Sequence, residues 1–154
     1  MRWPRGEATI EQLMAVGELE RVQPDDAHVT MLLTTARAHL ASAELLRDTD
    51  PAGSYGLMYD AARKSMTAIL AHQGLRATSR GGHVAVYQAV SAQLDPPLGK
   101  IVRPFNRMRA RRNDVEYPSP EDPAVTPAEV AEDLGKAAAI VEMAEKAIPG
   151  MGVF

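Results

Sequence analysis

The sequence predicts an all-α protein, folded as an antiparallel bundle of four to five helices. Apolar residues recur at spacings of three and four along most of the chain, and strand-like alternation is nowhere convincing. Alanine and methionine are plentiful while aromatic residues make up only 5% of the chain, a composition typical of helices packed through small, adaptable side chains. A length of 154 residues is sufficient for one domain with one core.

The first 22 residues are predicted to be a leading helical segment. Thr9 and Gln12 have the spacing of a capping box, which indicates a short helix over 9–21. The sequence QPDD at 23–26 interrupts the apolar pattern and separates this segment from the bundle.

Two long helices are predicted next, over about 26–47 and 52–73. The first has one apolar face, formed by Val29, Leu33, Ala36, Leu40, Ala43 and Leu46. Pro51 suits the beginning of the second helix. Gly74 followed by Leu75 is typical of a helix C-terminus closed by a hydrophobic contact.

The second half of the bundle begins after a loop at 76–82. A shorter helix is expected to run to Leu94, where the sequence DPP ends it. A further helix is predicted over 98–117, with Pro104 either kinking it or marking a start near Arg103.

The last helix has the strongest start signal in the chain. Thr126, Pro127 and Glu129 combine a capping box with a proline at the first helical position. The helix is expected to run to Ile148 and to be followed by a frayed tail over 149–154. The bundle domain is therefore predicted to span residues 23–148.

Composition excludes several classes of function. A formal net charge of −3 argues against a general electrostatic grip on nucleic acid, so any such contact must come from a local patch. The absence of cysteine excludes disulfides and thiolate catalysis, and the scattered histidines predict neither a metal site nor a cofactor. No apolar run suits a signal peptide or a membrane span, so we expect a cytoplasmic protein without membrane contact.

The helix predicted over 98–117 contains a concentration of arginines. Its apolar stripe includes one of them, in the series Ile101, Phe105, Met108, Arg112 and Val115. A second row, Arg103, Arg107 and Arg111, is predicted to be a solvated face. A guanidinium in core register is costly unless it is paired or opens onto a cleft.

Two interpretations of Arg112 are open. It could form an internal ion pair with Asp60 or Glu116. Alternatively, it could share a polar pocket with Asn113 and Tyr117 and bind a phosphate through two hydrogen bonds.

Three segments together resemble the HEPN domain family over about residues 27–147. They are YDAARKSMTAILAHQG at 59–74, GGHVAVYQAV at 81–90 and RRNDVEYP at 111–118. The resemblance implies a helical bundle that forms a homodimer in which the signature helices of two subunits build one cleft. Many members are metal-independent endoribonucleases of toxin–antitoxin, defence or RNA-processing systems. Others are RNA-binding modules or non-catalytic partners of nucleotidyltransferases.

The chain departs from the family signature at one residue. The family has an arginine, a polar residue and then a histidine, but here Tyr117 stands where the histidine is expected, and no histidine follows it. A phenol with a pKa near 10 is a poor base at neutral pH. By the resemblance, Tyr117 could instead be a site of nucleotidylation. His83, at the start of a helix, could supply the missing base or could be purely structural.

We therefore expect phosphate binding to survive while cleavage is weak or absent. The candidate phosphate ligands are Arg109 and Arg112, and the candidate catalytic residues are Arg112, Asn113, Tyr117 and His83. Two alternatives remain: an active ribonuclease toxin that uses Tyr117 or His83, and a non-catalytic antitoxin or partner subunit in which Arg112 is structural.

Overall fold

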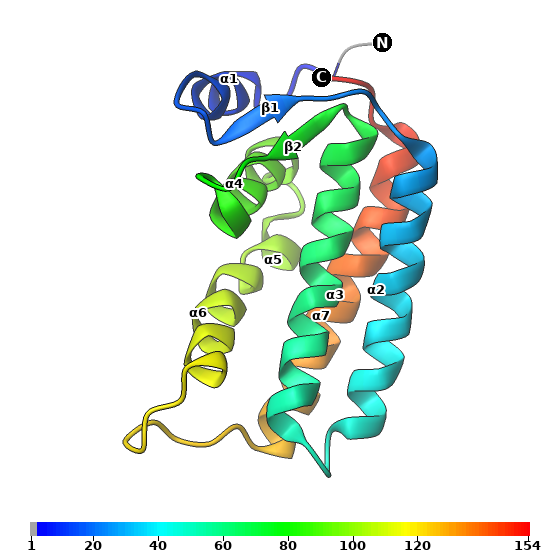
Figure 1. Cartoon of the computed structure of the whole chain (residues 1–154). Coiled ribbons are helices and arrows are strands. Elements are labelled where there is room, and N and C mark those ends of the chain that lie inside the picture. The colour runs from blue at the N-terminus through cyan, green and yellow to red at the C-terminus, as the bar shows by residue number, and fades with distance from the viewer. Residues whose placement is uncertain (1–2) are drawn as a thin grey trace.

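The computed structural model describes residues 3–154 and is mostly helical (Figure 1). The elements in chain order are α1 (Glu7–Ala15), β1 (Leu19–Arg21), α2 (Asp26–Leu46), α3 (Pro51–His72), β2 (Leu75–Ala77), α4 (Gly82–Leu94), α5 (Gly99–Val102), α6 (Pro104–Glu116), α7 (Pro127–Ala147) and a 3-10 turn, η1 (Ile148–Gly150). Within the described residues, no helix combines the length and apolar character needed to cross a membrane.

Three long helices, α2, α3 and α7, pack side by side and contain most of the core (Figure 1). Each begins at a side-chain cap: the side chains of Asp25, Asp50 and Thr126 accept hydrogen bonds from the backbone N–H groups three residues later. These caps satisfy donors that have no partner inside the helix. The helices predicted over 26–47, 52–73 and 126–148 are therefore confirmed.

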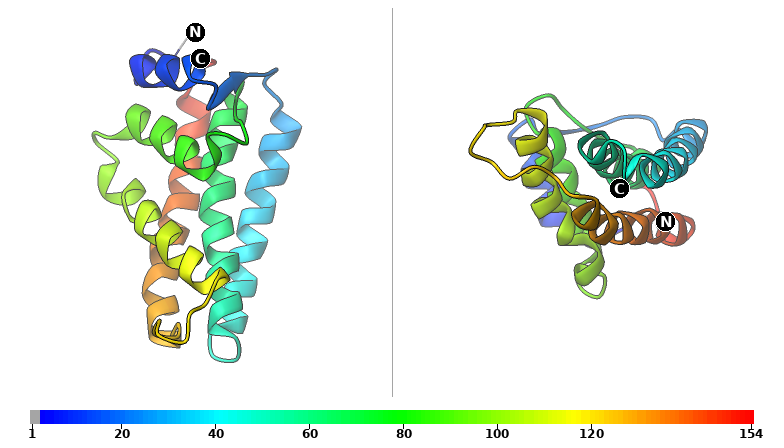
Figure 2. Two further views of the ribbon diagram at one scale, coloured as in Figure 1. Left: turned by 60° about the vertical axis from the view of Figure 1, so that its left-hand side comes forward. Right: turned by 90° about the horizontal axis from the view of Figure 1, so that it is seen from below.

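α3 lies at the centre of the bundle and packs against α2, α4, α6 and α7. α4, α5 and α6 cover the side of α3 that faces away from α2 (Figure 2). Phe105 of α6 stacks on Tyr59 of α3 with ring centroids 5.1 Å apart, and on Tyr87 of α4 at 6.1 Å. The break expected near Pro104 is confirmed, because α5 ends at Val102 and Pro104 is the first residue of α6.

The leading segment differs from its prediction. The helix begins at Glu7 and ends at Ala15, and residues 19–21 form a strand that pairs antiparallel with 75–77, Leu19 opposite Ala77. Our expectation of a chain without strands was wrong here, because each strand has three residues and their pairing joins distant parts of the chain. Gly74 has a φ of 76° where α3 ends, and Leu75 after it is buried, as predicted.

The predicted frayed tail over 149–154 is also wrong. Met151 and Phe154 are buried in the core. The backbone N–H of Phe154 donates to the carbonyl oxygen of Gln73 at 3.0 Å, and that of Trp3 donates to the carbonyl of Val153 at 3.0 Å. These bonds hold the two ends of the described chain together at one end of the bundle (Figure 1).

Candidate functional site

The arginines of the row predicted to be a solvated face are ion-paired, and two of them, Arg103 and Arg107, are also 63% and 53% exposed. Arg103 contacts Asp95 at 3.1 Å, and Arg111 contacts Glu129 at 2.9 Å. Arg107 forms two hydrogen bonds to the carboxylate of Asp133 on α7, which is only 2% exposed. The acidic partners of Arg107 and Arg111 lie in another helix, α7, so these ion pairs could not be located from the local pattern.

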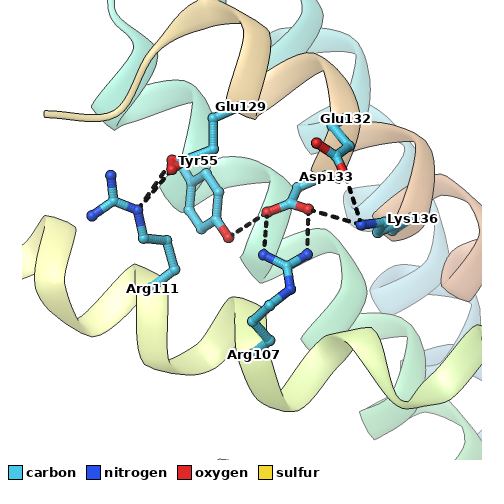
Figure 3. A network of polar contacts seen from close by, with 7 residues as sticks. All are labelled: Tyr55, Arg107, Arg111, Glu129, Glu132, Asp133 and Lys136. Carbon is cyan, nitrogen blue, oxygen red and sulfur yellow. Dashed lines mark hydrogen bonds and ion pairs between the residues drawn. The ribbon is translucent and has the colours of Figure 1, made fainter. Parts of the chain in front are cut away.

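The Arg107–Asp133 pair belongs to a network that holds α6 against α3 and α7 (Figure 3). The Tyr55 hydroxyl donates to Asp133 at 2.8 Å, and the Lys136 ammonium lies 3.6 Å from the same carboxylate. Burial by itself raises the pKa of Asp133, but the hydrogen bonds from Arg107 and Tyr55 outweigh it and leave that pKa below its ordinary value. The buried carboxylate of Asp133 is paired within the network, so we assign the network to stability.

A second group of arginines is only partly neutralised by neighbouring acids. We call Arg63 of α3 with Arg109 and Arg112 of α6 the arginine cluster. The guanidinium carbon of Arg112 lies 5.7 Å from the ring centroid of Tyr59, and the Arg112 side chain is 28% exposed. The positive charges of all three arginines act to lower the pKa of both Tyr59 and His83.

Among residues 3–154, two carboxylates contact the arginine cluster. Asp60 lies 3.5 Å from Nε of Arg63, and Glu116 approaches Arg112 to 3.9 Å. The Nε atoms of Arg63, Arg109 and Arg112 are buried and make no hydrogen bond. Of the two partners proposed for Arg112, Glu116 is therefore the one in contact. This ion pair is long and partly exposed, so it contributes little to stability. The cluster keeps a local excess of positive charge in a chain of net charge −3.

His83 lies at the start of α4, where its Nδ1 is 2.7 Å from the hydroxyl of Tyr59. Burial lowers the pKa of His83, and the charges of Arg63 and Arg112 lower it further. Burial also raises the pKa of Tyr59 to about 12, so this phenol keeps its proton. At neutral pH the pair is therefore a neutral imidazole and a neutral phenol.

This pair can act in two ways, depending on the tautomer. If Nδ1–H donates to the Tyr59 oxygen, Nε2 of His83 is left as an available base. If the Tyr59 hydroxyl donates to Nδ1 instead, Nε2 carries a proton and can donate a hydrogen bond to an anionic ligand. Both arrangements place a histidine next to the arginine cluster.

The other predicted site residues lie at the solvent-facing end of α6. Asn113 is exposed, and Tyr117, which is 75% exposed, ends the helix with its N–H donating to the Asn113 carbonyl at 3.0 Å. Within residues 3–154, no hydrogen bond or ion pair joins either side chain to Arg112. The structure thus brings together Arg109, Arg112 and His83, while the roles of Asn113 and Tyr117 stay predictions.

Two residues of this site were missed from the sequence. Neither Tyr59 nor Arg63 was singled out as a site residue. Both lie on α3 four residues apart, which places them on one face of the helix. That spacing was a usable signal, but only the packing of α6 on α3 shows what this face meets.

Within residues 3–154, no group of three or more His, Cys, Asp or Glu side chains is placed to hold a metal ion. The site is therefore built from guanidinium, imidazole and phenol groups. Compared with protein-family models, curated proteins and solved structures, the chain matches none of them.

Proposed function

We propose that this protein binds the phosphate groups of RNA or of a nucleotide at the arginine cluster. The observation that carries the proposal is the position of Arg112 over the ring of Tyr59, whose hydroxyl lies 2.7 Å from His83. The charges of Arg63 and Arg109 also act on this pair, and within residues 3–154 only Asp60 and Glu116 offset the three arginines. Guanidinium groups suit this task because their planar donors match pairs of phosphate oxygens. Because the net charge of the chain is negative, a phosphate-binding site in it must be a local patch of positive charge, as this cluster is.

The packing of the cluster supports the same function. Tyr59 is fully buried and lies beneath Arg112, so the guanidinium rests on a rigid platform and loses little freedom on binding. Phosphate contacts of this kind position a ligand without reading its sequence. By its HEPN resemblance, we further propose that the protein acts as a homodimer in a toxin–antitoxin or defence system, with weak or no ribonuclease activity.

The test is the binding of end-labelled single-stranded RNA, followed by fluorescence anisotropy at several salt concentrations. Arg112→Ala should weaken binding and lower the slope of log K against log salt by about one. Arg103→Ala is the matched control, since it removes one arginine near the start of α6, outside the cluster and 63% exposed. Equal losses in the two variants, or no binding by the wild type, would overturn the proposal and favour a partner-protein role.

A second candidate function is metal-independent RNA cleavage, which the placement of His83 favours. In such cleavage the 2′-oxygen attacks phosphorus and the bond to the 5′-oxygen breaks. A base accepts the 2′-hydroxyl proton and an acid returns one to the leaving oxygen. A neutral His83 can serve as that base, and Arg112 can stabilise the charge that develops on the phosphate.

Incubation with RNA in EDTA tests this second function. If it holds, the wild type and Tyr117→Phe should cut the RNA, whereas His83→Ala and Arg112→Ala should not. RNA that stays intact with every protein would reject the nuclease for that substrate and leave phosphate binding as the function.

A further inference from the structure

α2 carries an apolar stripe on its inner face and, on the opposite face, a second stripe that is apolar except for Thr34. The inner stripe is packed against the bundle and includes Val29, Ala36, Leu40 and Ala43. We call the other the outer stripe; its members alternate at spacings of four and three and are all exposed: Ala27, Met31, Thr34, Ala38, Ala41 and Leu45. Each outer-stripe residue lies two positions along the chain from an inner-stripe position. Because successive residues are turned by about 100° around the helix axis, the two stripes point in nearly opposite directions. The outer stripe therefore has the pattern of a helix-packing seam, but no helix of the described residues is packed on it.

The exposure of this stripe is unusual for a solvated helix face. Leu45 and Met31 are 82% and 58% exposed, more than any other large aliphatic side chain in residues 3–154. A solvated face is normally covered with charge, yet α2 has only Asp26, Arg37 and Glu44 as charged residues. α2 packs against α3 and α7 and forms an outer edge of the bundle (Figure 2).

A groove of about 530 Å³ runs beside the outer stripe, between α2 and α7. Its α7 wall is formed mainly by small residues, Ala131, Gly135 and Ala138, together with Leu134. Small side chains let a second helix approach closely, and Ala38 and Ala41 at the middle of the outer stripe have the same property. The surface therefore suits a helix lying along α2.

We propose that the occupant is a second copy of this chain, with the two α2 helices antiparallel about a two-fold axis near their midpoints. Charge complementarity favours this arrangement. Arg37 and Glu44 lie one heptad apart on the same edge of the outer stripe. In an antiparallel pair these edges face each other, so each Arg37 meets Glu44 of the other copy, and the two-fold axis forms that contact twice. A parallel pair would set Arg37 opposite the uncharged Ser42.

The same register determines the layers of the interface. It places Ala38 against Ala41 of the second copy and Thr34 against Leu45 of the second copy, so small residues meet at the centre and Leu45 is covered at each end. Arg37 now contacts Glu145 on α7 and Glu44 contacts Arg47. Both side chains remain accessible, at 49% and 54% exposure, so each can accept a second partner.

This interface does not depend on the proposed phosphate site. α2 and α6 lie on opposite sides of α3 (Figure 2), so pairing through α2 leaves the arginine cluster open in both copies. It also differs from the shared cleft that the HEPN resemblance implies, in which the α6 helices would face each other.

Disulfide cross-linking gives the sharpest test, because the chain contains no cysteine of its own. Under mild oxidation, a mixture of Thr34→Cys and Leu45→Cys chains should form a cross-linked heterodimer faster than either variant cross-links with itself. A parallel pair would instead cross-link Leu45→Cys with itself. Val84→Cys, exposed on α4, is the control for random collision.

Sedimentation of the full chain gives a second, independent readout. The wild type should be a dimer at micromolar concentration, and Leu45→Lys should raise its dissociation constant at least about tenfold, because it places a charge in an apolar seam. Val16→Lys, at an exposed apolar position outside α2, should leave the dimer intact. A monomeric wild type, or a dimer unaffected by Leu45→Lys, would overturn the proposal. RNA binding by Leu45→Lys is measured as well, because a variant that still binds RNA has kept its phosphate site whatever its oligomeric state.

Discussion

The hydroxyl of Tyr59 lies 2.7 Å from Nδ1 of His83 and joins the middle of α3 to the first turn of α4. The same tyrosine ring supports Arg112 from α6. One buried side chain thus positions both the histidine and the arginine of the candidate site. The chemistry of that site therefore depends on how three helices pack around Tyr59.

Removing the charge of Arg112 should raise the pKa of His83. Burial is the main reason that this pKa is low, and the positive charges of Arg63 and Arg112 add to it. In Arg112→Gln the pKa should move up toward 6.5 without reaching it, because burial remains. NMR titration of the imidazole protons measures this, with Arg103→Gln as the control. An unchanged or lower pKa in Arg112→Gln would mean that the arginine does not act on His83.

The two kinds of arginine on α6 should differ in their effect on stability. Arg107→Ala leaves the buried carboxylate of Asp133 without its main partner and should lower the free energy of unfolding by about 1–3 kcal/mol. Arg112→Ala loses a loose surface pair and a ring contact, for which we expect about 1 kcal/mol or less. Urea denaturation of both variants gives the comparison. A larger loss in the free energy of unfolding for Arg112→Ala than for Arg107→Ala would assign the structural role to Arg112 and leave Arg107 for function.

Stability should fall in acid partly through Asp133. Its pKa in the folded protein is below the ordinary 3.8, so the unfolded chain takes up this proton first as the pH falls. The stabilising contribution is complete above pH 3.8 and is lost as the pH falls through the folded pKa. The free energy of unfolding of Asp133→Asn should therefore depend less steeply on pH in this range. If the free energy of unfolding depended on pH equally in the wild type and in Asp133→Asn, Asp133 would be excluded as a source of acid sensitivity.

Phe154 should contribute to stability as a core residue. It is 5% exposed, and its backbone bonds to Gln73 at the end of α3. Phe154→Ala should lower the free energy of unfolding by about 3 kcal/mol, the lower end of the range for a buried phenylalanine. Val153→Ala, at a position 50% exposed, should change it by no more than about 0.5 kcal/mol. If thermal unfolding gave the same free energy of unfolding for both variants, the tail would be frayed as first predicted.

The sequence by itself determined the helical class and the limits of the long helices. The caps at Asp25, Asp50 and Thr126 and the proline at 104 act within a few residues, so their effect can be predicted without the fold. The candidate residues Arg109 and Arg112 were also predictable, because clustering of arginines on one helix is a local property.

Only the tertiary structure decided which polar groups meet. The pairing of 19–21 with 75–77 and the Arg107–Asp133 pair join residues that are far apart in sequence. The contact of Tyr59 with His83 likewise depends on how α4 crosses α3. Periodicity describes one helix at a time and contains no information about the face of its neighbour. The separation of the ion-paired arginines from the arginine cluster was therefore set by helix packing, which brings an acid to Arg107 and an aromatic ring to Arg112.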